Sequence, residues 1–160
     1  MPRRSFYSHG RRTLDTTRHF SPDEETALAG ARSIEAQEIA DKDGTVAIGG
    51  ANALLERLPA NRWAVVTSAG PALAAHRLTA AGLPLPSIVI TAADVSVGKP
   101  DPEGYLFAAR QLGVAPADCI VFEDTFAGHE AARRGGMRSV NRQAAPPKSR
   151  WSAHLPAGLF

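Results

Sequence analysis

The stretch that decides the fold is Cys119-Ile120-Val121-Phe122-Glu123-Asp124-Thr125, an apolar run that ends in two carboxylates and a hydroxyl. Continuous apolar, β-branched residues are typical of a strand that is buried on both faces of a parallel sheet. Two similar runs lie upstream, at residues 63–67 and 87–91. The sequence therefore predicts parallel strands at these three places, and more weakly a fourth strand at residues 138–140.

Each predicted strand is followed by a segment with the features of a helix. We expect helices over residues 71–81, 101–112 and 127–134, each ending at a glycine, which readily ends a helix. Asp101 is the predicted N-cap of the second of these helices. Alternation of strand and helix predicts an α/β fold, in which right-handed crossovers build a parallel sheet.

The first quarter of the chain carries helical signals only. Ser21 can cap a helix, Pro22 suits the first helical position, and Glu24 completes a capping box. Apolar residues then recur at helical spacing, and residues 11–19 predict a shorter helix before them. We therefore divide the chain into a helical segment, an α/β core and an irregular tail, at residues 1–44, 45–142 and 143–160.

Composition limits the class of protein. The chain has 160 residues, 44% hydrophobic and 21% charged, which is typical of a globular domain. A single cysteine, Cys119, excludes an internal disulfide framework and a multi-cysteine zinc site. No apolar run approaches about 18 residues, so we expect no membrane partner and a cytoplasmic location. The net charge of +2 conceals basic ends, which we interpret as solvated termini rather than a nucleic-acid site.

Polar side chains follow each predicted strand, at the edge where ligands of parallel sheets bind. Thr67 and Ser68 precede a helix, and their hydroxyls with its first N–H groups fit a phosphate cradle. A simple N-cap explains the same two residues equally well. Lys99 lies between two strands, where its ammonium can neutralise a phosphoryl oxygen, although a surface lysine is an equal alternative.

Glu123 and Asp124 come directly after the third apolar run. Adjacent carboxylates at the end of a buried strand cost free energy unless a cation or hydrogen bonds compensate them. Mg²⁺ prefers oxygen ligands and is usually held by one or two carboxylates with waters and phosphate. The sequence therefore favours a magnesium site at these two residues.

Three segments in this order resemble motifs II, III and IV of the haloacid dehalogenase-like hydrolases. They are Thr67-Ser68, Gly98-Lys99-Pro100-Asp101-Pro102, and residues 122–128 with the sequence Phe-Glu-Asp-Thr-Phe-Ala-Gly. The branch that the chain resembles contains sugar-phosphate phosphatases and β-phosphoglucomutase-like proteins. The resemblance covers about residues 8–140 and implies a three-layer, parallel-sheet core with a helical cap, to which residues 1–44 contribute. One departure is Phe126, where the family usually has proline.

The resemblance also implies an activity, the Mg²⁺-dependent hydrolysis of a small phosphorylated metabolite such as a sugar phosphate. The phosphoryl group is transferred through an aspartyl-phosphate intermediate. A phosphosugar mutase, which uses the same core residues, and a non-catalytic protein that only binds phosphate or a metabolite remain alternatives. The implied site residues are Thr67 and Lys99 for the phosphoryl group, Glu123 and Asp124 for the metal, and His9, Gly10, Arg11 and Ser68 for the substrate.

A large departure concerns the nucleophile, which in the family is an Asp-x-Asp pair ending the first apolar strand. No such strand precedes His9, so we expect a truncated chain that lacks this strand of the core and is marginally stable or aggregation-prone. Residues 63–67 and 119–123 are then expected to flank a slot of about 9–10 Å, twice the interstrand spacing, and not to hydrogen-bond each other.

Asp41-Lys42-Asp43-Gly44-Thr45 spells the nucleophile motif literally. In a capless member of the family, this pair would need an apolar strand directly before it. Residues 34–40 instead have the pattern of a polar helix. We therefore interpret Asp41 and Asp43 as part of the linker between cap and core.

Overall fold

The computed structural model describes residues 9–41 and 45–141. Predictions for the tail at residues 143–160 and for Asp43 lie outside the described residues. The elements, in chain order, are α2 (Thr13–Phe20), α3 (Glu24–Ala40), α4 (Ala51–Leu55), η1 (Ala60–Arg62), β1 (Val65–Val66), α5 (Pro71–Ala80), β2 (Val89–Ile90), α6 (Glu103–Leu112), η2 (Pro116–Asp118), β3 (Ile120–Glu123), α7 (Phe126–Arg134) and β4 (Arg138–Asn141).

The four predicted strands form two parallel pairs. β1 pairs with β2, with Val65 opposite Val89, and β3 pairs with β4, with Ile120 opposite Arg138. Within the described residues β1 and β3 belong to separate sheets, so the expectation that they do not hydrogen-bond each other is confirmed. β1 and β2 keep only two residues each of the five-residue runs expected.

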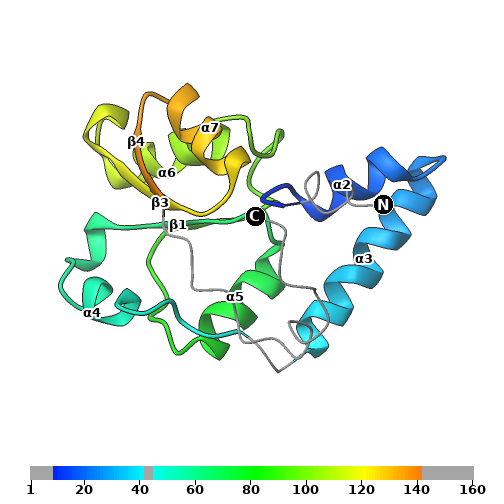
Figure 1. Cartoon of the computed structure of the whole chain (residues 1–160), viewed down its shortest axis with the longest axis horizontal. Helices are drawn as coiled ribbons and strands as arrows, with labels where there is room; N and C mark the ends of the chain where they lie inside the picture. The colour runs from blue at the N-terminus through cyan, green and yellow to red at the C-terminus, as the bar shows by residue number, and fades with distance from the viewer. Residues whose placement is uncertain (1–8, 42–44, 142–160) are drawn as a thin grey trace, which may run out of the picture.

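The helices are arranged on both sides of the strands. In Figure 1, α6 and α7 lie on one side and α5 on the other, while α2 and α3 form a hairpin at the end of the molecule. One cluster of buried residues joins α6, α7 and β3. Its members are Tyr105, Ala109, Val121, Ala131, Ala132 and Met137. This parallel α/β architecture is the one that the sequence predicts.

The start of α3 differs from the prediction. Asp23, rather than Ser21, is the N-cap, and its carboxylate accepts a 2.7 Å hydrogen bond from the backbone N–H of Thr26. Ser21 instead lies at the end of α2, in extended backbone. A carboxylate is the better cap here because it also interacts favourably with the positive end of the helix.

The start of α6 also lies later than expected. Pro102 is its N-cap position, and Asp101 accepts a 2.9 Å hydrogen bond from the N–H of Glu103 at the first helical residue. α7 begins at Phe126, where Thr125 caps the helix by accepting from the N–H of Gly128.

Residues before Asp41 form helix, as the sequence predicts. α3 runs to Ala40, and the backbone N–H of Asp41 donates a hydrogen bond to the carbonyl of Gln37. Asp41 therefore ends a helix and does not follow a strand. No helix within the described ranges is long and apolar enough to cross a membrane.

Candidate active site

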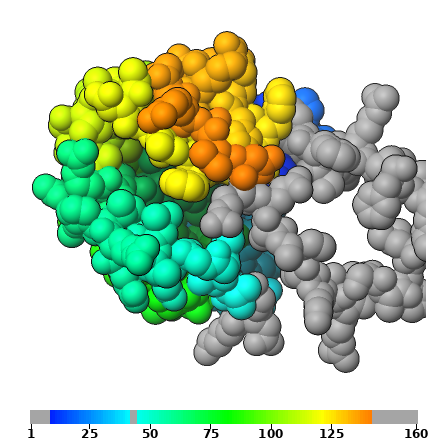
Figure 2. Space-filling model, turned by 60° about the vertical axis from the view of Figure 1, so that its left-hand side comes forward, coloured from blue at the N-terminus to red at the C-terminus, as the bar shows by residue number. Residues whose placement is uncertain are grey.

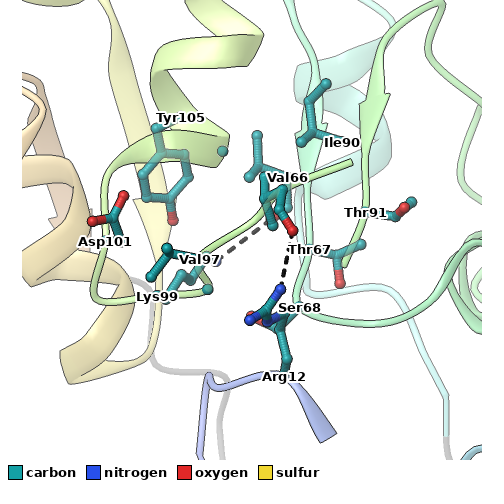
Figure 3. Close-up of a pocket in the computed structure, with 13 residues that line it drawn as sticks. Arg12, Val66, Thr67, Ser68, Ile90, Thr91, Val97, Lys99, Asp101 and Tyr105 are labelled. Carbon is teal, nitrogen blue, oxygen red and sulfur yellow. Dashed lines mark hydrogen bonds between the residues drawn. The ribbon is translucent and has the colours of Figure 1, made fainter. Parts of the chain in front are cut away.

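A buried ion pair lies at the centre of the site. The ammonium of Lys99 is 2.7 Å from Oε2 of Glu123, and the two side chains are 13% and 7% exposed. Lys99 follows β2 in a loop, while Glu123 is the last residue of β3. The same ammonium lies 3.5 Å from the carbonyl oxygen of Val66 at the end of β1, a contact drawn in Figure 3. Lys99 thus contacts the ends of strands in both sheets.

Both carboxylate oxygens of Glu123 accept further hydrogen bonds. Oε2 accepts from the hydroxyl of Tyr105 at 2.7 Å. Oε1 accepts from the backbone N–H groups of Asp124 and Thr125, at 3.1 and 3.0 Å, and from the Thr125 hydroxyl at 2.9 Å. This buried charge is therefore fully compensated, as buried charges in proteins generally are.

The helix that follows β3 packs directly against this carboxylate. Gly128, in the first turn of α7, has no side chain, and a Cβ there would overlap the carboxylate of Glu123. The N–H of Gly128 donates to the hydroxyl of Thr125, which in turn donates to Glu123. Gly128, in the motif at residues 122–128, thus allows α7 to approach β3 at the site.

The surroundings fix the protonation states of Glu123 and Tyr105. Burial raises the pKa of Glu123, but the charge of Lys99 and the hydrogen bonds from Lys99, Tyr105 and Thr125 outweigh this and lower it to about 2. Burial and the neighbouring charge of Glu123 raise the pKa of Tyr105 above its ordinary value of 10.0. At neutral pH Glu123 is ionised and Tyr105 is a hydrogen-bond donor.

Sequence reasoning missed Tyr105, although a signal was present. Tyr105 falls on the same face of α6 as Ala108 and Ala109, which are also buried. A buried tyrosine hydroxyl usually has a hydrogen-bond partner. The pattern of α6 therefore places a donor against the sheet edge, but it does not identify Glu123 as the acceptor.

The Thr67-Ser68 segment continues from β1 into the start of α5. The N–H of Thr67 donates to Ile90 of β2 at 2.9 Å, and its hydroxyl accepts from the N–H of Ala69 at 3.1 Å. No side chain caps the first turn of α5, whose N-cap is Gly70. The hydroxyl of Thr67 can therefore donate to an anion, whereas the carboxylate of Glu35 already lies against Gly70 at the start of the helix.

Of the predicted His9–Arg11 group, Gly10 lies against the core segments. The hydroxyl of Ser68 donates to the carbonyl of Gly10 at 2.8 Å. Gly10 has a φ of 78°, and a Cβ there would overlap the side chain of Thr125. His9 is exposed, and within the described ranges Arg12, rather than His9 or Arg11, lines the pocket beside Lys99.

Thr67, Ser68 and Lys99 are brought together, as the sequence predicts, around one pocket (Figure 3). Asp124 is exposed and directly follows Glu123, whose oxygens are already engaged. No group of three His, Cys, Asp or Glu side chains within the described residues could hold a metal ion. Mg²⁺ is commonly bound by a single carboxylate with waters and phosphate, and Asp124 fits that mode better than Glu123 does.

Comparison with known proteins agrees with the motifs. Residues 6–136 match the family model of haloacid dehalogenase-like hydrolases. The chain is 37% identical over 150 residues to hexitol phosphatase A of Escherichia coli (strain K12), a match covering 89% of this chain and 68% of that protein. It is 47% identical over 103 residues to validoxylamine A 7'-phosphate phosphatase of Streptomyces hygroscopicus subsp. limoneus, covering 62% of this chain and 48% of that protein.

Solved structures show the same similarity. A hydrolase from Pseudomonas syringae superimposes with a TM-score of 0.68 and 28% identity, covering 86% of this chain and 67% of that one. The chain therefore spans about half to two thirds of the length of these proteins. By its family match, its fold and its three motifs, the chain belongs to the haloacid dehalogenase-like hydrolases.

Proposed function

We propose that this chain is a Mg²⁺-dependent phosphatase of small phosphorylated sugars or sugar alcohols. The observation that carries the proposal is the pocket in which Thr67, Ser68 and Lys99 meet, with Lys99 held by Glu123. Two relatives are named as phosphatases, one of hexitols and one of validoxylamine A 7'-phosphate, and both names denote phosphorylated polyhydroxy compounds.

Thr67 and Lys99 act on the phosphoryl group. The Thr67 hydroxyl donates to one of its oxygens, and the Lys99 ammonium neutralises their negative charge. Glu123 and Tyr105 hold that ammonium in place before the substrate arrives. Charges that are already oriented stabilise a transition state without a reorganisation cost.

Asp124 is the residue that we assign to Mg²⁺, with Glu123 behind it as the partner of Lys99. When bound, Mg²⁺ neutralises charge on the phosphoryl oxygens. Asp124 is exposed at the carboxyl end of β3, next in sequence to the carboxylate that holds Lys99. The family mechanism also needs an aspartate nucleophile, and we assign that role to none of the described residues.

The α2–α3 hairpin is the part of the cap that we assign within residues 1–44, and residues 45–142 form the core. Gly10 joins the two parts, since its carbonyl accepts a hydrogen bond from Ser68 and its Cα lies against Thr125. His9 and Arg11 are the neighbours of Gly10 in the sequence. We therefore assign His9, Gly10 and Arg11 to the non-phosphorylated part of the substrate.

Phosphate release and ligand binding test this proposal together. The chain is incubated with Mg²⁺ and a panel of phosphorylated hexoses and hexitols, and the Lys99→Met variant serves as the control. We expect Mg²⁺-dependent binding of these ligands that EDTA and Lys99→Met both weaken, and release of phosphate only if an aspartate outside the described residues supplies the nucleophile.

The other outcomes separate the alternatives. Binding of a phosphorylated hexitol without phosphate release would indicate the non-catalytic binding protein. Isomerisation of a sugar phosphate without release would indicate the mutase. Failure to bind any member of the panel would contradict the proposed function.

A further inference from the structure

We propose that the site around Lys99 selects substrates with one phosphoryl group and an uncharged remainder, and that Asp15 sets this preference by neutralising Arg12. The inference rests on the proposed function for the phosphoryl end of the substrate. It goes further than that function because it names Asp15 as a specificity residue and predicts that the substrate carries no second anionic group. Arg12 and Asp15 belong to none of the three motifs.

The basic side chains around the pocket are already paired. Of the described residues that line it, two are basic, Arg12 and Lys99. Lys99 is paired with Glu123. Arg12 forms a two-pronged ion pair with Asp15, in which Nε and Nη2 donate to the two carboxylate oxygens at 2.7 and 2.8 Å. This geometry is the strongest that an arginine and a carboxylate adopt.

The Arg12–Asp15 pair is fixed in its position. Nη1 of Arg12 donates to the carbonyl of Val95 at 3.0 Å, and Figure 3 shows Arg12 reaching the pocket from the segment before α2. Arg12 and Asp15 are 13% and 26% exposed. The pair lies against Gly98, where a Cβ would stand 2.9 Å from Arg12 and from Asp15 alike. The loop before Lys99 therefore leaves room for the pair.

The Arg12 guanidinium is a poor site for a second anion, because its nitrogens already donate to Asp15 and to the carbonyl of Val95. Any phosphate or carboxylate that approached Arg12 would also meet the charge of Asp15, so the net attraction would be small. A further carboxylate, Glu35 of α3, lies close to Gly70 at the start of α5. Neutral hydroxyl groups carry no such penalty and can hydrogen-bond to these carboxylates.

The same arrangement favours a phosphatase over a mutase. A phosphosugar mutase must hold a sugar with phosphoryl groups at both ends, and the second group requires a cation besides Lys99, which is assigned to the first. Within the described pocket lining, the other basic side chain is Arg12, and it is paired with Asp15. We therefore expect a bisphosphate to bind weakly.

Calorimetric titration measures this preference without requiring turnover. The chain with Mg²⁺ is titrated with fructose 6-phosphate and with fructose 1,6-bisphosphate. We expect the monophosphate to bind at least about tenfold more tightly. In Asp15→Asn, which releases the charge of Arg12, we expect the affinity for the bisphosphate to rise about tenfold, while that for the monophosphate changes little.

Two further variants serve as controls. Asp15→Glu keeps the negative charge and should keep the wild-type preference. Arg12→Gln combined with Asp15→Asn should cancel the gain in bisphosphate affinity, because the released cation is then gone. Thermal unfolding identifies any variant that does not fold, and the wild-type comparison of the two ligands does not depend on a variant.

Each outcome bears on the proposal. A wild-type chain that binds both ligands equally well overturns the selectivity. An unchanged ratio in a folded Asp15→Asn protein overturns the role of Asp15. Failure of wild type to bind either ligand contradicts the proposed function itself, and this inference falls with it.

Discussion

Lys99 and Glu123 are both nearly buried, so each depends on the other for compensation of its charge. Lys99→Met leaves Glu123 without its cation, and removing one partner of a buried pair costs about 3–5 kcal/mol. We expect urea unfolding to show this loss. The matched control is Arg77→Met, which breaks an exposed pair with Glu38. That change should cost no more than about 1 kcal/mol.

Acid should weaken the fold through Glu123. Its pKa is lowered from 4.5 to about 2, so its ionised form stabilises the folded chain above pH 4.5. This contribution is lost as the pH falls from 4.5 to about 2, where the folded chain also takes up the proton. We expect Glu123→Gln to remove this part of the acid dependence, measured by denaturant unfolding between pH 5 and pH 2. A variant with the same acid dependence as wild type would contradict the assignment.

Tyr105→Phe removes a hydroxyl and keeps the ring. The loss of one hydrogen bond to a buried charge costs about 1.5–3 kcal/mol. Because the hydroxyl positions Glu123 and through it Lys99, we expect phosphate release to slow mainly through kcat, with a smaller change in KM. Ser139→Ala, which removes a hydrogen bond to His129 outside the pocket, is the control. Equal effects of the two variants on kcat would show that Tyr105 is only structural.

The residues that sequence reasoning found are those carried by local patterns. Thr67 lies directly after a predicted strand, and Lys99 lies in a short motif after the next strand. Because the strands are parallel, both residues are expected at the same edge of the sheet. Tyr105 and Asp15 lie within helices, and their roles depend on which partner the fold brings to them. A sequence gives no direct sign of such contacts between distant segments.

Gly128 decides how closely α7 approaches β3. Gly128→Ala would place a methyl group inside the space of the Glu123 carboxylate, and overpacking a core typically costs about 1–3 kcal/mol. We expect a lower melting temperature together with a loss of phosphate release. Gly49→Ala, at a position with open space around it, is the control and should change neither.

The helices and strands that the sequence predicts are present in the described residues, but their ends differ. The complete capping box in the sequence predicts that α3 starts at Ser21. The structure uses Asp23, since α2 ends at Ser21 and the turn between the two helices takes up Pro22. The apolar runs at residues 63–67 and 87–91 are likewise longer than the paired segments. An apolar residue can be buried without being paired with a neighbouring strand.

The outer face of the β3–β4 pair is apolar and accessible. Ile120, Phe122 and Val140 are exposed, Phe122 by 55%, and in Figure 2 this yellow to orange segment lies at the surface. Accessible apolar strand faces promote association. We expect the chain to bind a hydrophobic dye such as ANS and to associate as its concentration rises. Phe122→Ser should reduce both, measured by fluorescence and light scattering, and an unchanged signal would contradict this origin.

The position of Lys99 links ligand binding to the cohesion of the whole molecule. Its nitrogen contacts Val66 at the end of one strand pair and Glu123 at the end of the other. A phosphoryl oxygen that binds this nitrogen therefore adds a third oxygen partner where the two strand pairs meet. The temperature of thermal unfolding should then rise with phosphate concentration. Lys99→Met, which removes this nitrogen, should abolish the rise.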